Sequence, residues 1–289
     1  MGKNSLLNKI VIIAMFSALA CAGTFIQIRM PAGDFVHLGN FVMIVAALLL
    51  GGLAGGISGA LGMGIYDLIF YTSKPSTILR TFILKFIVGF AVGFLFRLII
   101  KKDINSKKIL YGLSILFLSI GILFTILFVL GDKSKFGFEN GLSSTFANIF
   151  GTKNSFNISL YVPIFSYLFG IGSLVAAILA HKLSKRSMAA LVAISVAVFL
   201  NIIGEFVLRW FLEGLMVSDF NTSIVVATSK IPGSFITGFI SVILSVLIYE
   251  PIYRAVKNTG IFKDDTANLD ENEDNENIEI KEVRQNEAK

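Results

Sequence analysis

Long apolar runs constrain the fold of this chain more than any other feature. A run of about 18 or more apolar residues is typical of a transmembrane helix. The chain has eight apolar segments, most of them this long, at roughly 9–28, 39–51, 55–71, 80–100, 109–131, 158–181, 187–212 and 231–253. Charged residues make up only 15% of the chain, against roughly 25% in an average soluble domain. The sequence therefore predicts an all-α polytopic membrane protein with about eight spans.

Two local features qualify this count. The second and third segments are short and joined by GGLAGG without a polar loop, so they are either two short tilted helices or one broken pair. The motif ALAC, which ends at the single cysteine Cys21, faintly resembles a signal-peptide or lipoprotein site. The apolar run continues to Ile28, however, and is long enough to span. We therefore expect the first segment to be a membrane helix, and one cysteine excludes an internal disulfide.

Basic residues predict the orientation, because Lys and Arg accumulate in cytoplasmic loops. They lie before the first segment, between the fourth and fifth, between the sixth and seventh, and after the eighth: Lys3, Lys9, Arg97, Lys101, Lys102, Lys107, Lys108, Lys182, Lys185, Arg186, Arg254, Lys257 and Lys263. With eight spans all of these fall on one side. The pattern predicts that both termini lie in the cytoplasm and that 132–157 lies outside. We expect the membrane to be a cell membrane, the bacterial plasma membrane.

The formal net charge of +6 conceals an asymmetry. Residues 264–289 contain ten acidic and three basic residues, a net charge of −7, which leaves +13 on the rest of the chain. This excess lies largely in the predicted cytoplasmic loops, so it indicates topology and not nucleic-acid binding. The tail is too polar to form a core, and we expect it to be disordered or a loose helix.

Small residues repeat at helical spacing in the early segments. Gly51, Gly55 and Gly59 lie four residues apart, as do Gly52, Gly56, Ala60 and Gly64. Small residues let helices in a membrane approach closely, so these glycines predict tight internal packing. No G-x-x-x-x-G-K-[ST] motif is present, so the chain has no recognisable phosphate-binding loop for ATP hydrolysis.

Ionisable and amide side chains inside the apolar segments are the candidates for a functional site, because such groups are expensive in a bilayer. The predicted substrate-binding residues are His37, Asn40, Asp67, Lys85, Asn201, Glu205 and Arg209. All lie toward the predicted outer side, which indicates a polar pocket that opens outward and is closed below. The alternative is a structural ion cluster of Asp67, Lys85 and Glu205. The chain has two histidines, and one of them, His181, lies on the predicted cytoplasmic side, so we expect no metal site. No Ser-His-Asp or Cys-His set can be placed, and we expect no catalytic residue and no cofactor.

The run VHLGNFVMIVAALLLGGLAGGISGALGMGIYDL resembles the substrate-binding S component of energy-coupling factor (ECF) vitamin transporters. It looks closest to the branch that includes riboflavin, pyridoxine and thiamine-precursor components. TFILKFIVGF, LNIIGEF and KIPGSFITGFISVIL are similar to later segments of that family. The family usually has six membrane helices, so the resemblance implies a six-helix core with two inserted helices. The predicted units are 1–108, the inserted pair 109–186, 187–258 and the acidic tail 259–289.

The resemblance also implies a function. An S component captures a vitamin at the outer face and hydrolyses nothing itself, while one coupling membrane subunit and two ATPase subunits drive release inward. Ala14, Ala18 and Ala22 resemble the alanine motif that contacts the coupling subunit, although packing against the protein's own helices is an equal alternative. Two other functions stay open: a membrane-embedded enzyme that uses Asp67, Lys85 and Glu205, and a stand-alone carrier.

Overall fold

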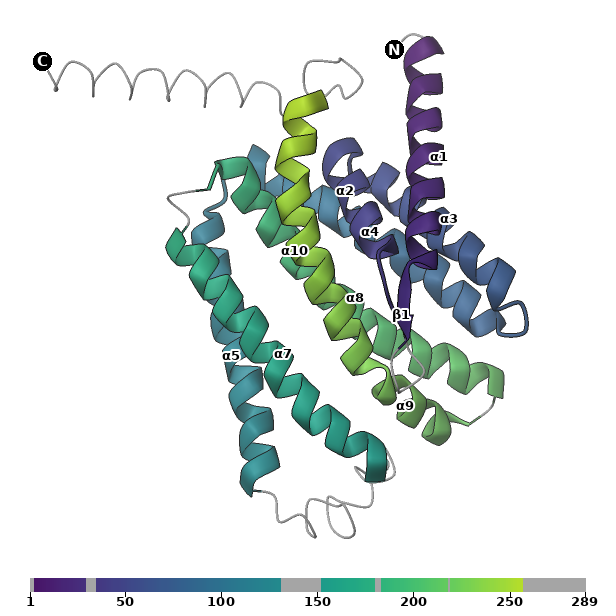
Figure 1. Ribbon diagram of the computed structural model, residues 1–289, viewed down its shortest axis with the longest axis vertical. Coiled ribbons are helices and arrows are strands. Elements are labelled where there is room, and N and C mark those ends of the chain that lie inside the picture. Colours follow the sequence, from purple (N-terminus) through teal and green to yellow (C-terminus); the bar gives the residue numbers. More distant parts are fainter. Residues whose placement is uncertain (1–2, 30–34, 131–151, 180–182, 218, 257–289) are drawn as a thin grey trace, which may run out of the picture.

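The computed structural model describes residues 3–29, 35–130, 152–179, 183–217 and 219–256, and within them the protein is almost wholly helical (Figure 1). The helices are α1 (Lys3–Phe25), α2 (Gly39–Leu50), α3 (Gly52–Phe70), α4 (Pro75–Lys101), α5 (Ser106–Leu130), α7 (Thr152–Ile178), α8 (Lys185–Val217), α9 (Phe220–Ser229) and α10 (Ile231–Val256). The strands β1 (Gln27–Arg29) and β2 (Phe35–His37) form a short hairpin. The chain is thus an all-α polytopic membrane protein, as the sequence predicts.

Each of the eight apolar segments contains one helix, and six helices among the described residues are long and apolar enough to cross a membrane. The other two are α2 and the part 162–178 of α7. At 1.5 Å per residue, the 12 residues of α2 reach about 18 Å, short of the ~30 Å hydrocarbon core. The second segment is therefore a short helix that depends on its neighbours.

Two elements differ from the sequence prediction. The first apolar segment does not stay helical to Ile28: α1 ends at Phe25, and Gln27–Arg29 pairs antiparallel with Phe35–His37. The FVH stretch supplies the aromatic and β-branched residues that favour a strand. The second addition is α9, whose sequence FNTSIVVATS is too short and too polar to register as a span.

A glycine explains how α2 and α3 join without a polar loop. Gly51 has φ +105°, a backbone conformation that side-chain-bearing residues rarely adopt, and it separates the two helices. The helices then pack closely through glycines: a Cβ on Gly89 of α4 would lie 2.7 Å from the Gly55 carbonyl carbon of α3. The predicted role of these glycines in close packing is confirmed.

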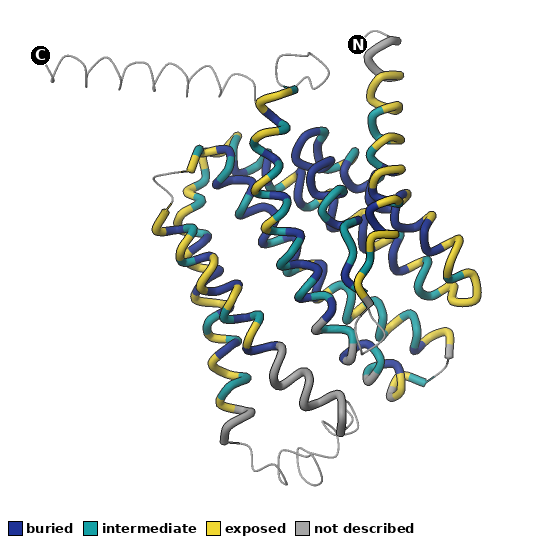
Figure 2. The backbone as a smooth tube through the Cα atoms, viewed as in Figure 1, coloured by how far each residue is buried: buried dark blue, intermediate teal, exposed yellow. Residues whose placement is uncertain are grey.

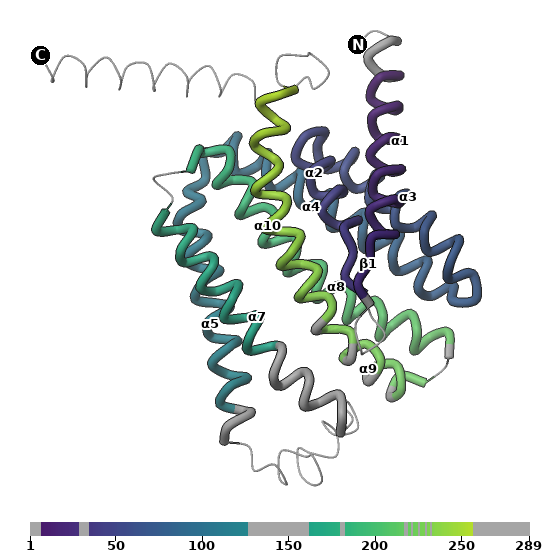
Figure 3. The backbone as a smooth tube through the Cα atoms, viewed as in Figure 1, coloured from purple at the N-terminus to yellow at the C-terminus, as the bar shows by residue number. Residues whose placement is uncertain are grey.

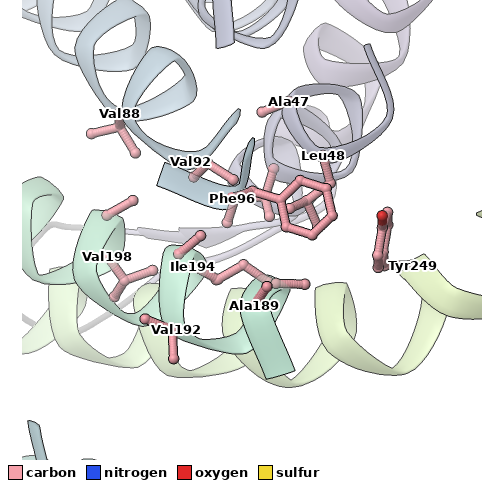
Figure 4. Close-up of a cluster of buried hydrophobic side chains, with 14 of the residues drawn as sticks. Ala47, Leu48, Val88, Val92, Phe96, Ala189, Val192, Ile194, Val198 and Tyr249 are labelled. Carbon is pink, nitrogen blue, oxygen red and sulfur yellow. The ribbon is translucent and has the colours of Figure 1, made fainter. Parts of the chain in front are cut away.

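The core lies between α2, α4, α8 and α10. Figure 4 shows Leu48, Val92, Phe96, Ile194 and Tyr249 pointing toward one another from these helices. The rings of Phe96 and Tyr249 meet edge to face with centroids 5.6 Å apart. Buried residues are concentrated here, whereas the outward faces of α1, α5 and α7 are largely exposed, as expected for surfaces in contact with lipid (Figure 2).

The helices also establish two ends of the molecule. The start of α1 and the end of α10 lie on the same side, while the β hairpin and α9 lie away from it (Figure 3). We call the side of the α1 start the terminal end. The pair α5–α7 lies beside α8 and α10 (Figure 3). The prediction that this pair is an insertion stays a prediction, and the acidic tail and 132–151 lie outside the described residues.

Candidate functional site

A cavity of about 690 Å³ lies at the end of the molecule opposite the terminal end. Its lining comes from β2, α3, α4 and α8 and from the first turns of α10, together with α2 and α9. All seven substrate-binding candidates line it: His37, Asn40, Asp67, Lys85, Asn201, Glu205 and Arg209. The structure therefore brings together residues that are up to 172 positions apart in the chain (209 − 37).

Glu205 is the centre of the charged part of the cavity. Its carboxylate lies 3.1 Å from Lys85 Nζ, 3.1 Å from Arg80 Nε and 3.6 Å from Arg209 NH2. Lys85 Nζ also donates a 2.8 Å hydrogen bond to Asn201 Oδ1. These contacts link α4 to α8 across the cavity, and the helical turn between Glu205 and Arg209 places both side chains on one face of α8.

A second carboxylate extends this network. Glu213 Oε1 lies 3.4 Å from Arg209 NH1 and 3.8 Å from Arg80 NH1. The network thus holds three cations and two carboxylates, with side chains between 5% and 19% exposed. Ion pairs buried to this degree need good geometry and further partners to offset the loss of hydration.

Asp67 belongs to the same cavity but not to this ion network. Its Oδ2 accepts a 2.5 Å hydrogen bond from Thr81 Oγ1, and none of the described ion pairs includes it. Of the three residues in the alternative of a structural ion cluster, Lys85 and Glu205 form a described ion pair and Asp67 does not; whether that pair is structural or binds substrate stays a prediction. Asp67 is buried at 6% exposure beside the cavity.

His37 stands at the hairpin edge of the cavity, outside the membrane helices. Its Nδ1 accepts a 3.2 Å hydrogen bond from the Gly39 backbone N–H, so the ring proton of the neutral form is on Nε2. Burial, together with the positive charge of Lys85, lowers the pKa of His37 to about 3. The ring is therefore uncharged at neutral pH. Phe35 packs beside it with centroids 5.5 Å apart.

Sequence reasoning missed several lining residues. Arg80 and Glu213 complete the ion network. Arg80 is the first residue of the fourth apolar segment and Glu213 directly follows the seventh, so the charges at the ends of these two segments were the signal that could have identified them. Phe35 and Tyr71 give the cavity an aromatic side, with near-parallel rings and centroids 6.4 Å apart. An isolated aromatic in an apolar chain carries no such signal, so this feature needed the fold.

No group of three His, Cys, Asp or Glu side chains in the described part of the chain is arranged to hold a metal ion. Asp34, in the segment before β2, and His181, between α7 and α8, lie outside the described residues. Near the end of α10, Glu250 and Arg254 form an ion pair of 3.1 Å, with the Arg254 side chain 70% exposed.

A model of the family described as "ECF-type riboflavin transporter, S component" matches residues 4–153. The chain belongs to this family. The match includes α1 to α5 and four of the seven cavity candidates of this S component: His37, Asn40, Asp67 and Lys85. No curated protein and no solved structure gives a significant match.

The alanine stripe of this S component, Ala14, Ala18 and Ala22, faces outward. All three residues are exposed on α1, so among the described residues the stripe is not used for packing against the protein's own helices. The opposite face of α1 is the one that packs: Ala20 and Thr24 are buried, and a Cβ on Gly62 of α3 would lie 2.5 Å from the Ser17 carbonyl.

Proposed function

We propose that this protein is the substrate-specificity subunit of an ECF-type importer. It binds a vitamin or vitamin precursor at the outer membrane face, and a partner module of one coupling membrane subunit and two ATPase subunits drives uptake. The observation that carries this proposal is the cavity of about 690 Å³ that is lined by all seven candidate residues. A pocket of roughly 300–1,000 Å³ suits a small-molecule ligand.

The lining supports a ligand with both an aromatic and a polar part. Phe35 and Tyr71 offer ring faces, while Asn201, Lys85 and Glu205 offer hydrogen-bonding groups. Asn40 is 6% exposed, and its Oδ1 has no hydrogen-bond partner among the described residues. A buried acceptor without a partner is unfavourable, so a ligand N–H or O–H at this position stabilises the bound state.

The geometry of the helices supports an outward-facing pocket. Lys74 and Pro75 at the start of α4 line the cavity, and the 27 residues of α4 carry the chain about 40 Å away from it. Lys101 at the end of α4, Lys185 at the start of α8 and Arg254 near the end of α10 therefore lie far from the pocket. Because Lys and Arg mark the cytoplasmic side, the pocket faces out.

The core below the cavity supports a specificity subunit and not a channel. Val88, Val92 and Phe96 of α4 are at most 2% exposed and pack against α8, so close-packed side chains fill the space beneath Lys85. These apolar side chains lie between the cavity and the terminal end. Release on the cytoplasmic side then requires a movement that a partner drives.

The first experiment measures ligand binding to the purified full chain in lipid nanodiscs. Riboflavin, pyridoxine and thiamine-precursor pyrimidine and thiazole alcohols are titrated separately by calorimetry, and each bound compound is recovered for mass analysis. We expect saturable 1:1 binding of one compound, recovered unchanged. Chemical conversion of the ligand would favour the membrane-embedded enzyme instead.

The second experiment tests the orientation in whole cells. In a Cys21→Ala background, a single cysteine is placed at Lys74 near the cavity or at Lys107 between α4 and α5; both positions are exposed. A membrane-impermeant maleimide should label Lys74→Cys in intact cells and Lys107→Cys only after permeabilisation. The reverse pattern would place the pocket on the cytoplasmic side.

The third experiment tests the alanine stripe. Ala18→Trp should abolish uptake in cells that contain the partner module while leaving ligand affinity intact, because a large side chain separates surfaces that small residues allow to meet. Gly172→Trp is the control: Gly172 is exposed on α7 with open space around its Cα. Normal uptake by Ala18→Trp would show that the stripe is not a docking surface.

A further inference from the structure

The charges of the ion network and Asp67 compensate one another. Three cations lie in the cavity with three carboxylates: Arg80, Lys85 and Arg209 with Asp67, Glu205 and Glu213. The formal charge of this set is zero (3 − 3). The other two basic lining residues, Lys74 and Lys230, are not buried. An uncharged ligand leaves this balance intact, whereas a charged ligand adds an uncompensated charge to a site of low exposure.

Asn40 differs from these groups, because its carboxamide takes part in none of the described hydrogen bonds. The residue is 6% exposed and lines the cavity, and its Oδ1 is buried without a partner. By contrast, Asn201 Oδ1 accepts from Lys85, and Asp67 accepts from Thr81. The terminal torsion of an asparagine side chain is broad, so a rotation presents either the oxygen or the nitrogen to a ligand. A buried polar group without a partner is unfavourable, so a ligand that pairs with Asn40 gains affinity.

His37 supplies a hydrogen-bond donor three residues before Asn40. The Gly39 backbone N–H donates to Nδ1, so the neutral ring carries its proton on Nε2. This Nε2–H has no hydrogen-bond partner among the described residues, and the ring lines the cavity. A donor at the end of β2 and an acceptor in the first turn of α2 are thus both left without a partner.

The backbone that carries these two side chains is held in place. The Leu38 N–H donates a 3.0 Å hydrogen bond to the Gly23 carbonyl of α1. Gly39 lies so close to α1 that a Cβ there would collide with Thr24 Oγ1, and β2 pairs with β1 through His37 and Gln27. Groups on a fixed backbone lose little conformational freedom when a ligand binds, which favours affinity.

We propose that His37 and Asn40 form a recognition edge for an uncharged lactam, the adjacent N–H and C=O groups of a heterocyclic ring. This inference rests on the proposed function and specifies the chemical group that the site recognises. The lactam C=O accepts from His37 Nε2–H, and the lactam N–H donates to Asn40 Oδ1. The ring faces of Phe35 and Tyr71, which line the same cavity, suit a planar heterocycle. Flavins and hypoxanthine carry such an edge, whereas pyridoxine and the thiamine-precursor alcohols lack it.

The first test removes the lactam N–H from the ligand. The purified full chain in nanodiscs is titrated with two pairs that differ by one methyl group on this nitrogen: riboflavin and 3-methylriboflavin, and hypoxanthine and 1-methylhypoxanthine. We expect the N–H member of at least one pair to bind at least about tenfold more tightly than its methylated partner, which is about 1.4 kcal/mol. The methyl group removes the donor and leaves the Asn40 oxygen unpaired in the complex.

Substitutions assign the two halves of the edge. Asn40→Leu, which is similar in size but apolar, should reduce the affinity ratio between the two members of a pair to less than about threefold. Asn40→Asp keeps an acceptor oxygen and should retain most of this ratio. His37→Phe removes the donor to the C=O that both members carry, so it should weaken both and leave the ratio unchanged. The ratio is internal to each protein, so a partial loss of folded material does not change it.

The contrary outcomes are also decisive. An Asn40→Leu protein that keeps the full ratio, or a His37→Phe protein with normal affinity for both members, would overturn the inference. Equal or tighter binding of the methylated member in every pair that binds would also overturn it, as would binding of pyridoxine or a thiamine-precursor alcohol without binding of any lactam. In these cases the proposed vitamin-binding function stands. Binding of no compound in this panel or in the vitamin panel would overturn the proposed function, and the inference with it.

Discussion

The two halves of the α4–α8 pair perform different tasks with the same backbone geometry. Toward the cavity the helices face each other with Arg80, Lys85, Asn201 and Glu205, joined by contacts of 2.8–3.1 Å. Toward the terminal end the same helices face each other with apolar side chains, Val92 and Phe96 among them (Figure 4). On α4 the change occurs within about one turn, between Lys85 and Val88.

This difference indicates which half of the pair contributes most to the stability of the protein and which half contributes most to ligand binding. The apolar half is close-packed, so each side chain there stabilises through many short contacts. The polar half surrounds a cavity, and Asn40 Oδ1 in its lining has no hydrogen-bond partner among the described residues. We therefore expect substitutions in the apolar half to change stability at constant affinity, and substitutions in the polar half to change affinity more than stability.

The largest expected effect is at Phe96, whose side chain is 1% exposed. Phe96→Ala removes a ring that packs on Tyr249 and leaves a cavity, a change that destabilises soluble proteins by about 3–5 kcal/mol. Thermal unfolding in detergent should show a markedly lower Tm with an unchanged Kd in the folded fraction. Phe94→Ala is the control, because Phe94 is 52% exposed on the same helix. A Tm that falls equally in both variants would contradict a tightly packed apolar half.

The next effect is at Gly89, where α3 and α4 touch. A Cβ there would lie 2.7 Å from the Gly55 carbonyl carbon and oxygen, and the backbone has no flexible side chain to move aside. Gly89→Ala should destabilise the protein by about 1–3 kcal/mol, the range for overpacking. Gly112→Ala, with nothing within 4 Å, should be neutral or stabilising, because alanine favours a helix. Equal Tm values in the two variants would show that the contact at Gly89 can relax.

The sequence was sufficient to predict the apolar half and part of the polar half. Hydrophobic length and glycine spacing are local signals, so the eight apolar segments and the close contact at Gly55 follow from them. Buried charges are unfavourable in lipid, so Lys85, Asp67 and Glu205 could be identified one by one as candidates that line a common site. Their actual partners could not be predicted, because Thr81 beside Asp67 and Arg80 beside Glu205 depend on the rotation of each helix. The hairpin and α9 were missed because neither has the length of a span.

The third prediction concerns the polar half. Lys85→Ala and Glu205→Ala should each weaken ligand binding at least about tenfold, or about 1.4 kcal/mol, because each removes a charged hydrogen-bonding group and strands its partner. Arg254→Ala is the control, since it breaks an exposed ion pair of the kind that contributes about 0–1 kcal/mol. Kd and Tm are measured on the same samples. A lower Tm with normal affinity in Glu205→Ala would make the network a purely structural cluster.

The smallest expected effect is a pH dependence that originates at the edge of the polar half. The pKa of His37 is lowered to about 3 in the folded protein by burial and by Lys85, whereas an unfolded histidine titrates near about 6.5. Between these values the unfolded state binds more protons than the folded state, so the free energy of unfolding should fall as the pH drops from about 6.5 toward 3. His37→Gln keeps a polar side chain and removes this proton uptake. We expect Tm to decline less between pH 7 and pH 4.5 in His37→Gln than in the unmodified protein. The control is His181→Gln, which changes the only other histidine and should retain the decline. If His37→Gln lost stability with acid as steeply as the unmodified protein, the acid sensitivity would belong to the carboxylates of the cavity and not to His37.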